Sequence, residues 1–269
     1  MKPPPLLGLH HITAITGDAQ ANLDFYTQTL GLTLVKVTVN FDDPGSYHFY
    51  YGDETGSPGS IVTFFAWPRA KSGVVGKGQP TGFKLSTPQT TTERDIDGIA
   101  VDASVARPAR LLHADLQSAN VDASNAFATE QLGLTDNEGD SNGTCYFLSD
   151  DQTISITDYG RVPGRLGAGV IHHIAFRTEN PETQRHWRDH LLGHGVNVSP
   201  VMDRDYFTSI YFREPGGVLF EIATDGPGFG VDEDEPGTTL KLPTMYEPQR
   251  EKIEAVLPTI TLPNGKTLP

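Results

Sequence analysis

The chain contains almost no cysteine: Cys145 stands alone among 269 residues. A single cysteine cannot form an intramolecular disulfide, which favours a reducing, cytoplasmic compartment. We expect Cys145 to be a buried or half-buried small side chain. No segment approaches the roughly 18 apolar residues of a membrane-spanning helix, and residues 1–8 have no apolar stretch of signal-peptide length. We therefore expect no membrane partner.

Basic residues are also scarce. The sequence holds 20 Lys and Arg against 34 Asp and Glu, a formal net charge of −14 at pH 7. Because nucleic-acid affinity comes largely from Lys and Arg that neutralise phosphates, this balance argues against a nucleic-acid partner. The acidic run at 231–235 (VDEDE) is expected to be a solvated loop.

Hydrophobic residues make up 37% of the chain, enough for the core of one large or two small domains. They follow an internal repeat, in which a histidine precedes an aromatic residue at +14 and a Leu-Gly pair at +19. The histidines are His11, His113 and His173, the aromatics are Phe25, Phe127 and Trp187, and the pairs begin at Leu30, Leu132 and Leu192. Three matches at identical spacing indicate one structural unit used repeatedly.

Each unit is expected to begin with a short strand, such as 9–15 or 170–176, followed by an amphipathic helix, such as 18–29. The Leu-Gly pair should end that helix, since glycine adopts the left-handed cap conformation. Three strands then complete a βαβββ unit, the final two joined by a hairpin turn at 213–217. In the last unit these strands are expected at 197–202, 207–212 and 217–223.

The repeat predicts an α+β fold in which βαβββ units form curved mixed sheets around a metal cavity. The predicted divisions are a first unit (1–68), a shortened unit or linker (69–109), a middle unit (110–163), a last unit (164–226) and a C-terminal tail (227–269). Residues 69–109 lack the helix and the Leu-Gly pair of a whole unit. The tail is expected to carry one short helix at 248–256.

Two of the repeat histidines, His11 and His173, stand in His-His doublets on apolar strands. Each alone would more often be an ordinary core or surface residue. Glu221 lies inside another apolar strand, where a carboxylate is costly unless it is paired or bound to metal. Paired βαβββ units would bring the two equivalent histidines together, so His11, His173 and Glu221 are the predicted metal ligands. A 2-His-1-carboxylate set suits Fe(II), or Mn(II), better than structural zinc.

His113 leaves an alternative open. It holds the equivalent position in the middle unit, so His113, His173 and Glu221 would form the set if the last two units paired with each other. The doublets favour pairing of the first unit with the last, and therefore His11.

Two further residues are candidates because of the hairpin in the last unit. Tyr211 and Glu221 are each five residues from Gly216, which makes them cross-strand neighbours on one face. The Tyr211 phenol could then hydrogen-bond to substrate or oxygen, although a plain core tyrosine is the alternative. Arg204 would lie at the cavity rim or inside it, where it could hold a substrate anion unless it is solvated.

Alternation along the first strand places Thr13 on the same face as His11. It also sends His10 and His172 to the opposite face of a regular strand, which argues against them as ligands. A bulge, or a hydrogen bond to a ligand, could still make these two histidines relevant.

The doublets, the repeat and the run at 203–229 (DRDYFTSIYFREPGGVLFEIATDGPGF) resemble the vicinal oxygen chelate superfamily, and within it the ring-cleaving dioxygenases that act on hydroquinones. The likeness covers the first, middle and last units and part of the tail. It implies ferrous iron held by residues matching His11, His173 and Glu221. It also implies supporting roles for Tyr211, Arg204, Thr13, His10 and His172. Family members usually carry four complete units, so the shortened second unit is a departure that bears on substrate access and oligomer contacts.

The sequence thus predicts an Fe(II)-dependent ring-cleaving dioxygenase that takes a hydroquinone or catechol and O2, and inserts both oxygen atoms. One alternative is a glyoxalase-like lyase or isomerase, which consumes no oxygen and often uses four protein ligands. The other is a non-catalytic small-molecule binder of the same fold, which needs no metal. The ring substituents, the bond cleaved, the choice between iron and manganese, and whether the chain forms a homo-oligomer are not decided by the sequence.

Overall fold

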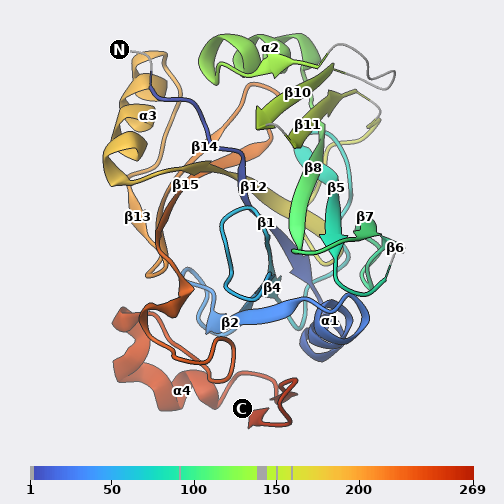
Figure 1. The fold of residues 1–269 in the computed structure, drawn as a ribbon, viewed down its shortest axis with the longest axis vertical. Helices are drawn as coiled ribbons and strands as arrows, with labels where there is room; N and C mark the ends of the chain where they lie inside the picture. The colour runs from blue at the N-terminus through green and yellow to red at the C-terminus, as the bar shows by residue number, and fades with distance from the viewer. Residues whose placement is uncertain (1–2, 91, 138–143, 150, 159) are drawn as a thin grey trace.

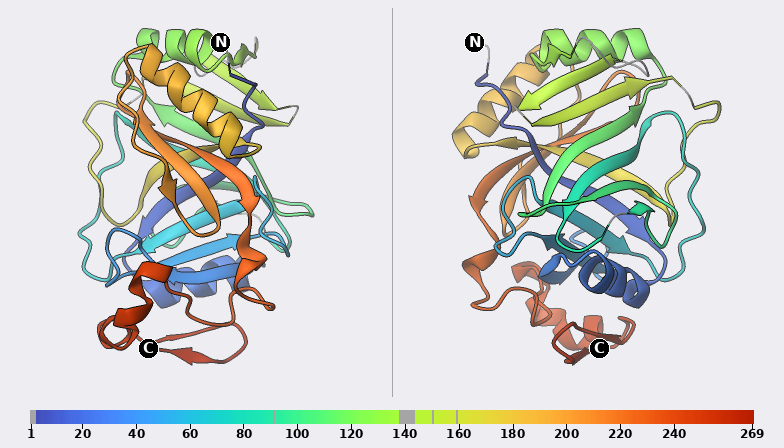
Figure 2. Two further views of the ribbon diagram at one scale, coloured as in Figure 1. Left: turned by 90° about the vertical axis from the view of Figure 1, so that its left-hand side faces the viewer. Right: turned by 45° about the vertical axis from the view of Figure 1, so that its right-hand side comes forward.

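A computed structural model describes residues 3–90, 92–137, 144–149, 151–158 and 160–269 (Figure 1). Residues 1–2 of the first predicted unit, and 138–143, 150 and 159 of the middle one, lie outside the described residues. Two large β-sheets form the body of the molecule, and the helices pack outside them (Figures 1 and 2). The predicted α+β fold of curved mixed sheets is confirmed.

The first sheet has eight strands in the order β13-β14-β15-β12-β1-β4-β3-β2. Their bounds are β1 (Leu9–Thr16), β2 (Thr33–Val39), β3 (Tyr47–Gly52), β4 (Ile61–Ala66), β12 (Val170–Thr178), β13 (Met202–Asp203), β14 (Phe207–Arg213) and β15 (Leu219–Pro227). Strands β1 and β12 pair antiparallel at its centre, with β4 parallel to β1 and β15 parallel to β12. This arrangement puts the two His-His doublets on adjacent strands.

The second sheet has seven strands in the order β6-β7-β5-β8-β11-β10-β9. Their bounds are β5 (Gln79–Thr87), β6 (Thr92–Arg94), β7 (Ala100–Val105), β8 (Arg110–Gln117), β9 (Thr135–Asp136), β10 (Thr144–Ser149) and β11 (Gln152–Thr157). Strands β5 and β8 pair antiparallel, with β7 parallel to β5 and β11 parallel to β8. Among its described residues, the stretch 69–109 contributes β5, β6 and β7 but no helix. Cys145 is buried in β10.

The helices follow the strands of the repeat. They are α1 (Ala19–Asp24) continued by the π-helix η1 (Phe25–Thr29), α2 (Val121–Ala126) continued by the π-helix η2 (Phe127–Gln131), and α3 (Pro181–Gly193). The first two end as predicted, with Gly31 and Gly133 at φ of 72° and 71°. The prediction is wrong for α3, which continues through Gly193 and is followed by the left-handed Gly195.

The later end of α3, relative to the first two helices, has a physical reason. A π turn holds more residues than an α turn, so the buried leucine comes one position later in the first two helices. In the regular α3 the inward residue is Leu191, and Leu192 is 42% exposed.

Two further predicted elements differ in length. The strand predicted at 197–202 is reduced to β13 and a single bridge from Val198 to Phe212, because Pro200 has no amide to donate to a ladder. The helix predicted at 248–256 is the 3-10 helix η4 (Thr244–Gln249) followed by α4 (Arg250–Glu254). Each described helix is too short or too polar to cross a lipid bilayer.

The tail lies against the β2 edge of the first sheet (Figure 2). It includes the 3-10 helix η3 (Phe229–Val231) and the hairpin β16 (Ile260–Thr261) and β17 (Thr267–Leu268). Its acidic run is largely exposed, as predicted, except that the Glu233 side chain turns inward. Asp232 and Glu233 accept from Nζ of the fully buried Lys36 on β2, at 2.7 and 2.8 Å. A buried ammonium needs paired carboxylates, and part of the acidic run supplies them.

Candidate metal centre

Three buried side chains from three neighbouring strands meet on the inner face of the first sheet. His11 on β1 pairs with Ala175 on β12, and Ala175 pairs with Glu221 on β15. His173 lies two residues from Ala175 on the same face. The Nε2 atom of His173 is 2.8 Å from Glu221 Oε2 and 3.4 Å from His11 Nε2, and His11 Nε2 is 3.3 Å from the same oxygen. The structure thus brings together the predicted His11, His173 and Glu221.

The geometry of these atoms fits a metal ion. A first-row divalent metal about 2.1 Å from three mutually perpendicular ligands would hold them about 3.0 Å apart, close to the distances observed here. Glu221 is fully buried, and its Oε2 atom, although close to both ring nitrogens, makes no well-directed hydrogen bond among the described residues. An unpartnered buried carboxylate oxygen between two ring nitrogens is explained by metal coordination. Glu221 Oε1 accepts a hydrogen bond from the Ser209 hydroxyl.

Electrostatics favour an ionised Glu221. Burial acts to raise the pKa of its carboxyl, but the imidazoles of His11 and His173 outweigh burial and hold that pKa well below the usual value. Burial also lowers the pKa of His173, against the opposing effect of Glu221. The preferred protonation states, an anionic carboxylate and a neutral imidazole, are those that metal ligands need.

His10 fixes the tautomer of His11. The Nε2 atom of His10 lies 3.1 Å from the Thr224 carbonyl, which can only accept, so this nitrogen carries the proton. Burial, and next the neighbouring His11, lower the pKa of His10 to about 3, so its ring is neutral and its Nδ1 accepts. His11 Nδ1, 2.9 Å away, must then be the donor. The proton on Nδ1 leaves His11 Nε2 bare and directed at the other ligands.

His172 stands in the same relation to His173. The two Nδ1 atoms are 2.7 Å apart, and burial and the neighbouring His173 lower the pKa of His172 to about 3. Neither strand is regular at its doublet. The register between β1 and β12 slips at His10 and again at His172, which are the extra residues of two β-bulges. The bulges explain why His10 and His172 lie beside the ligands, whereas a regular strand would direct them to the opposite face.

Tyr211 and Arg204 close one side of the site. Tyr211 is the register partner of Glu221 across β14 and β15, as the hairpin predicts. Its hydroxyl accepts a hydrogen bond of 3.2 Å from Arg204 Nε. Burial, and next the charge of Glu221, raise the pKa of Tyr211, so the phenol is neutral. Arg204 is mostly buried and also lies over the rings of Tyr211 and Phe41, with Asp42 3.6 Å away.

Thr13 faces the same space and belongs to a hydrogen-bonded series that the sequence analysis missed. Its hydroxyl accepts from Thr63 on β4 at 3.0 Å, and Thr63 contacts His48 Nε2 at 2.8 Å. His48 Nδ1 is 3.0 Å from the Tyr50 hydroxyl. The repeat gives no signal for these residues. The alternation of His48 and Tyr50 along β3 was the clue that could have revealed them.

The cavity beside the ligands is lined by His11, His173, Thr13, Arg204, Tyr211, His48 and Tyr50, together with apolar residues such as Phe65 and Phe207. Its volume is about 30 Å³, the space of one water molecule. An aromatic ring can therefore enter only if side chains around the cavity move.

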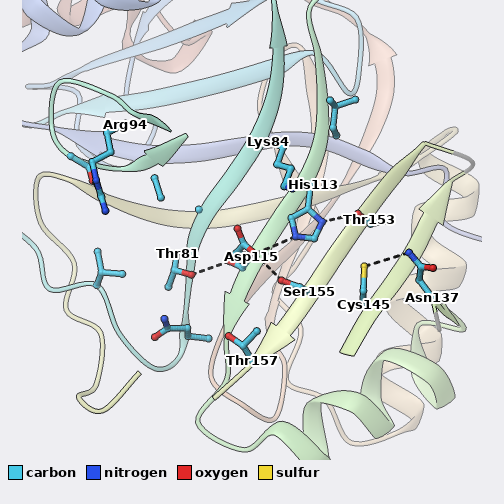
Figure 3. Close-up of a pocket in the computed structure, with 16 residues that line it drawn as sticks. Thr81, Lys84, Arg94, His113, Asp115, Asn137, Cys145, Thr153, Ser155 and Thr157 are labelled. Carbon is cyan, nitrogen blue, oxygen red and sulfur yellow. Dashed lines mark hydrogen bonds and ion pairs between the residues drawn. The ribbon is translucent and has the colours of Figure 1, made fainter. Parts of the chain in front are cut away.

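The alternative ligand His113 lies elsewhere, on the second sheet, inside an open cavity of about 890 Å³ (Figure 3). Its Nδ1 is 2.6 Å from the Thr153 hydroxyl and its Nε2 is 3.2 Å from Asp115. The register of β5, β8 and β11 places Gly82 and Ser155 where the first sheet has His11 and Glu221. His113 is therefore not part of the His-His-Glu group, and its sheet lacks the other two ligand types at the equivalent positions.

The fold and the buried site define a glyoxalase-type protein with a 2-His-1-carboxylate group able to hold a metal ion. Comparison with known proteins identifies the family. The chain belongs to the Glyoxalase/Bleomycin resistance protein/Dioxygenase superfamily, whose family model matches residues 8–75 and 110–222.

Within that superfamily its relatives are ring-cleaving dioxygenases, and the chain is an enzyme of this type. It is 40% identical to MhqO, a proposed ring-cleaving dioxygenase of Bacillus subtilis (strain 168), over 92% of this chain and 95% of the relative. It is 28% identical to a chlorohydroquinone/hydroquinone 1,2-dioxygenase of Sphingobium indicum, over 92% and 93% of the two chains. The crystal structure of a proposed dioxygenase from B. subtilis superposes with a TM-score of 0.89 at 36% identity, covering 97% of this chain and 99% of the other.

Proposed function

We propose that this chain is an Fe(II)-dependent dioxygenase that cleaves a hydroquinone- or catechol-type ring with O2 and inserts both oxygen atoms. The observation that supports it most is the buried His11, His173 and Glu221 group, which no fourth His, Cys, Asp or Glu joins among the described residues. Such a group leaves coordination positions open for substrate and oxygen. The named hydroquinone dioxygenase relative supports the substrate class.

Bound iron would supply binding positions for a phenolic oxygen and for O2, and a route for electrons between them. His10 holds the His11 ring in the required tautomer, and His172 supports the His173 ring through its Nδ1 contact. Arg204 places a fixed positive charge beside the cavity, where it offsets negative charge that develops on substrate and oxygen. The neutral Tyr211 hydroxyl can donate a hydrogen bond or a proton to an oxygen atom in the cavity.

The two alternative functions differ from a dioxygenase in oxygen consumption and in the metal ligands they need. A glyoxalase-like lyase or isomerase would consume no oxygen, and such enzymes often use four protein ligands where three are found here. A non-catalytic binder would have no use for three buried ligand groups brought together at one point. Manganese in place of iron would fit the same donor set.

The first experiment is oxygen uptake by protein loaded anaerobically with Fe(II), with methylhydroquinone and, in parallel, catechol. We expect uptake of one O2 per ring, none without iron, and none with Glu221→Ala, which also fails to retain the metal. An iron-loaded sample that takes up no oxygen with either ring would reject the proposal. A Glu221→Ala variant with normal turnover would reject the ligand set.

A further inference from the structure

A hydrogen-bonded series extends across the first sheet away from the metal ligands and has no role in the function proposed above. His48 and Tyr50 on β3 are 7% and 1% exposed, and both line the cavity. Their ring centroids are 4.1 Å apart. A buried histidine and a buried tyrosine that face a binding cavity are candidates for substrate recognition.

The register shows how far this series lies from the ligands. Tyr50 pairs with Thr63, Thr63 with Thr13, and Thr13 with His173, across β3, β4, β1 and β12. Three strand spacings separate Tyr50 from His173, about 14 Å between Cα atoms. The cavity therefore has a metal end and a Tyr50 end, with Phe65 and Phe207 among its walls. Once side chains have moved to admit it, a flat ring with one oxygen at the metal end directs its opposite edge toward Tyr50.

The directions of the hydrogen bonds decide what Tyr50 can recognise. The Thr63 hydroxyl donates its single proton to Thr13 Oγ1, so it must accept from His48 Nε2. Burial, and next the charges of His11 and His173, lower the pKa of His48 well below its usual value, so the ring is neutral and Nδ1 is an acceptor. The Tyr50 hydroxyl therefore donates to His48 Nδ1. Its proton is committed, and its oxygen can only accept from a ligand.

We propose that Tyr50, oriented by His48, accepts a hydrogen bond from a second hydroxyl on the far side of the substrate ring. This inference rests on the proposed ring-cleaving function and makes Tyr50 its specificity residue, with His48 as a positioning residue. A para-dihydroxylated ring reaches both ends of the cavity. The adjacent hydroxyls of catechol both lie at the metal end, and a methoxy group at the para position has no proton to donate.

The test is ligand binding to Fe(II)-loaded protein without oxygen, measured by calorimetry with hydroquinone, phenol and 4-methoxyphenol. We expect the wild type to bind hydroquinone about tenfold more tightly than either analogue, the effect of one net hydrogen bond. Tyr50→Phe removes the hydroxyl and keeps the ring that packs on Phe229. This variant should therefore bind the three ligands with about equal affinity.

Tyr51→Phe is the matched control. Tyr51 is the next residue on β3, is fully buried, and donates to Asn22 Oδ1 at 2.9 Å among residues that do not line the cavity. This variant should keep the tenfold preference. With oxygen present, Tyr50→Phe should lower kcat/KM about tenfold for methylhydroquinone and leave catechol unchanged.

Equal wild-type binding of the three ligands would overturn the assignment without any variant, and so would a preference that survives in Tyr50→Phe. The two proposals fail separately. If the wild type prefers hydroquinone tenfold but takes up no oxygen, the recognition role of Tyr50 is supported and the dioxygenase proposal is rejected. Normal oxygen uptake with no preference among the ligands would support the dioxygenase and reject the recognition role of Tyr50.

Discussion

At the scale of the residue, the site depends on which ring nitrogen carries a proton. The Thr224 carbonyl fixes the proton of His10 on Nε2, and His10 in turn fixes the proton of His11 on Nδ1. With a proton held on Nδ1, His11 directs its Nε2 at the metal position. A ligand whose tautomer is set before the metal arrives needs no rearrangement on binding, which favours affinity.

Replacing His10 with leucine tests this arrangement. Without an acceptor at His10 Nδ1, His11 loses the partner that holds its proton on Nδ1. We expect Fe(II) or Co(II) to bind 10- to 100-fold more weakly, the usual effect of losing the partner of a ligating histidine. Titration of metal-free protein measures this directly. The same change at His186, an exposed residue of α3, is the control, and equal affinities for the two variants would contradict the role of His10.

The residues that could be foreseen are those tied to the repeat or to the hairpin. His11 and His173 stand at equivalent positions, and Tyr211 and Glu221 are equidistant from Gly216, so spacing alone brings each pair together. The relation of His10 to His11 depends on a bulge, for which the sequence has no marker. His48 has no equivalent histidine in another unit, so alternation with Tyr50 was its single clue, and the folded sheet shows that both face the cavity.

At the scale of the element, a buried carboxylate in the region between residues 69 and 109 contacts the first unit. Asp95, which follows β6, accepts from the Tyr26 hydroxyl beside α1 at 3.2 Å. It also accepts from the amides of Asp97 and Ile99. Burial is the largest influence and raises the pKa of Asp95 to about 6. Composition could not predict this contact, because the described part of the region has no helix and Asp95 belongs to no repeat.

The difference in free energy of unfolding between the wild type and Asp95→Asn should depend on pH. The pKa in the folded state, about 6, is above the usual 3.8, so the native state binds the proton more tightly than the unfolded state does. The wild type is therefore favoured at low pH and loses that advantage as pH rises through 6. Relative to Asp95→Asn, its free energy of unfolding should increase by about 1.4 kcal/mol from pH 7 to pH 5.

Urea unfolding of metal-free protein at the two pH values measures the difference. Asp102→Asn, the same substitution at an exposed position of β7, is the matched control. A difference between the wild type and Asp95→Asn that stays constant from pH 7 to pH 5 would show that the Asp95 carboxyl does not titrate in this range.

At the scale of the whole molecule, the tail packs behind Tyr50, one of the residues that line the cavity. Phe229 packs on the rings of Tyr206 and Tyr50, and Tyr206 donates to Asp232 at 3.1 Å. The acidic composition of 231–235 suggested solvation, because sequence alone shows no partner for these charges. The partner is Lys36, almost 200 residues earlier, buried in the edge strand β2. Long-range neutralisation of this kind appears only when the fold is known.

Lys36→Met tests whether this ion pair holds the tail in place. Burial acts to raise the pKa of Glu233, but the hydrogen bonds from Lys36 and Thr239, with the charge of Lys36, together outweigh it and keep that pKa below its usual value. Removing the lysine leaves a carboxylate that is 4% exposed without its cation. We expect the free energy of unfolding to fall by about 3–5 kcal/mol.

The same substitution at Lys84 is the control, because its ion pair with Asp102 joins two half-exposed side chains at 3.5 Å. Lys84→Met should change stability by less than about 1 kcal/mol. Adding Glu233→Gln to Lys36→Met should recover part of the loss, since the unpaired charge is then gone. If Lys36→Met were no more damaging than Lys84→Met, the tail would be held by its apolar contacts alone. A loss of stability in Lys36→Met alone would show that this ion pair holds the tail in place. Asp232 also accepts from Tyr206, whose ring lies beside that of Tyr50, so the ion pair would support the Tyr50 end of the cavity.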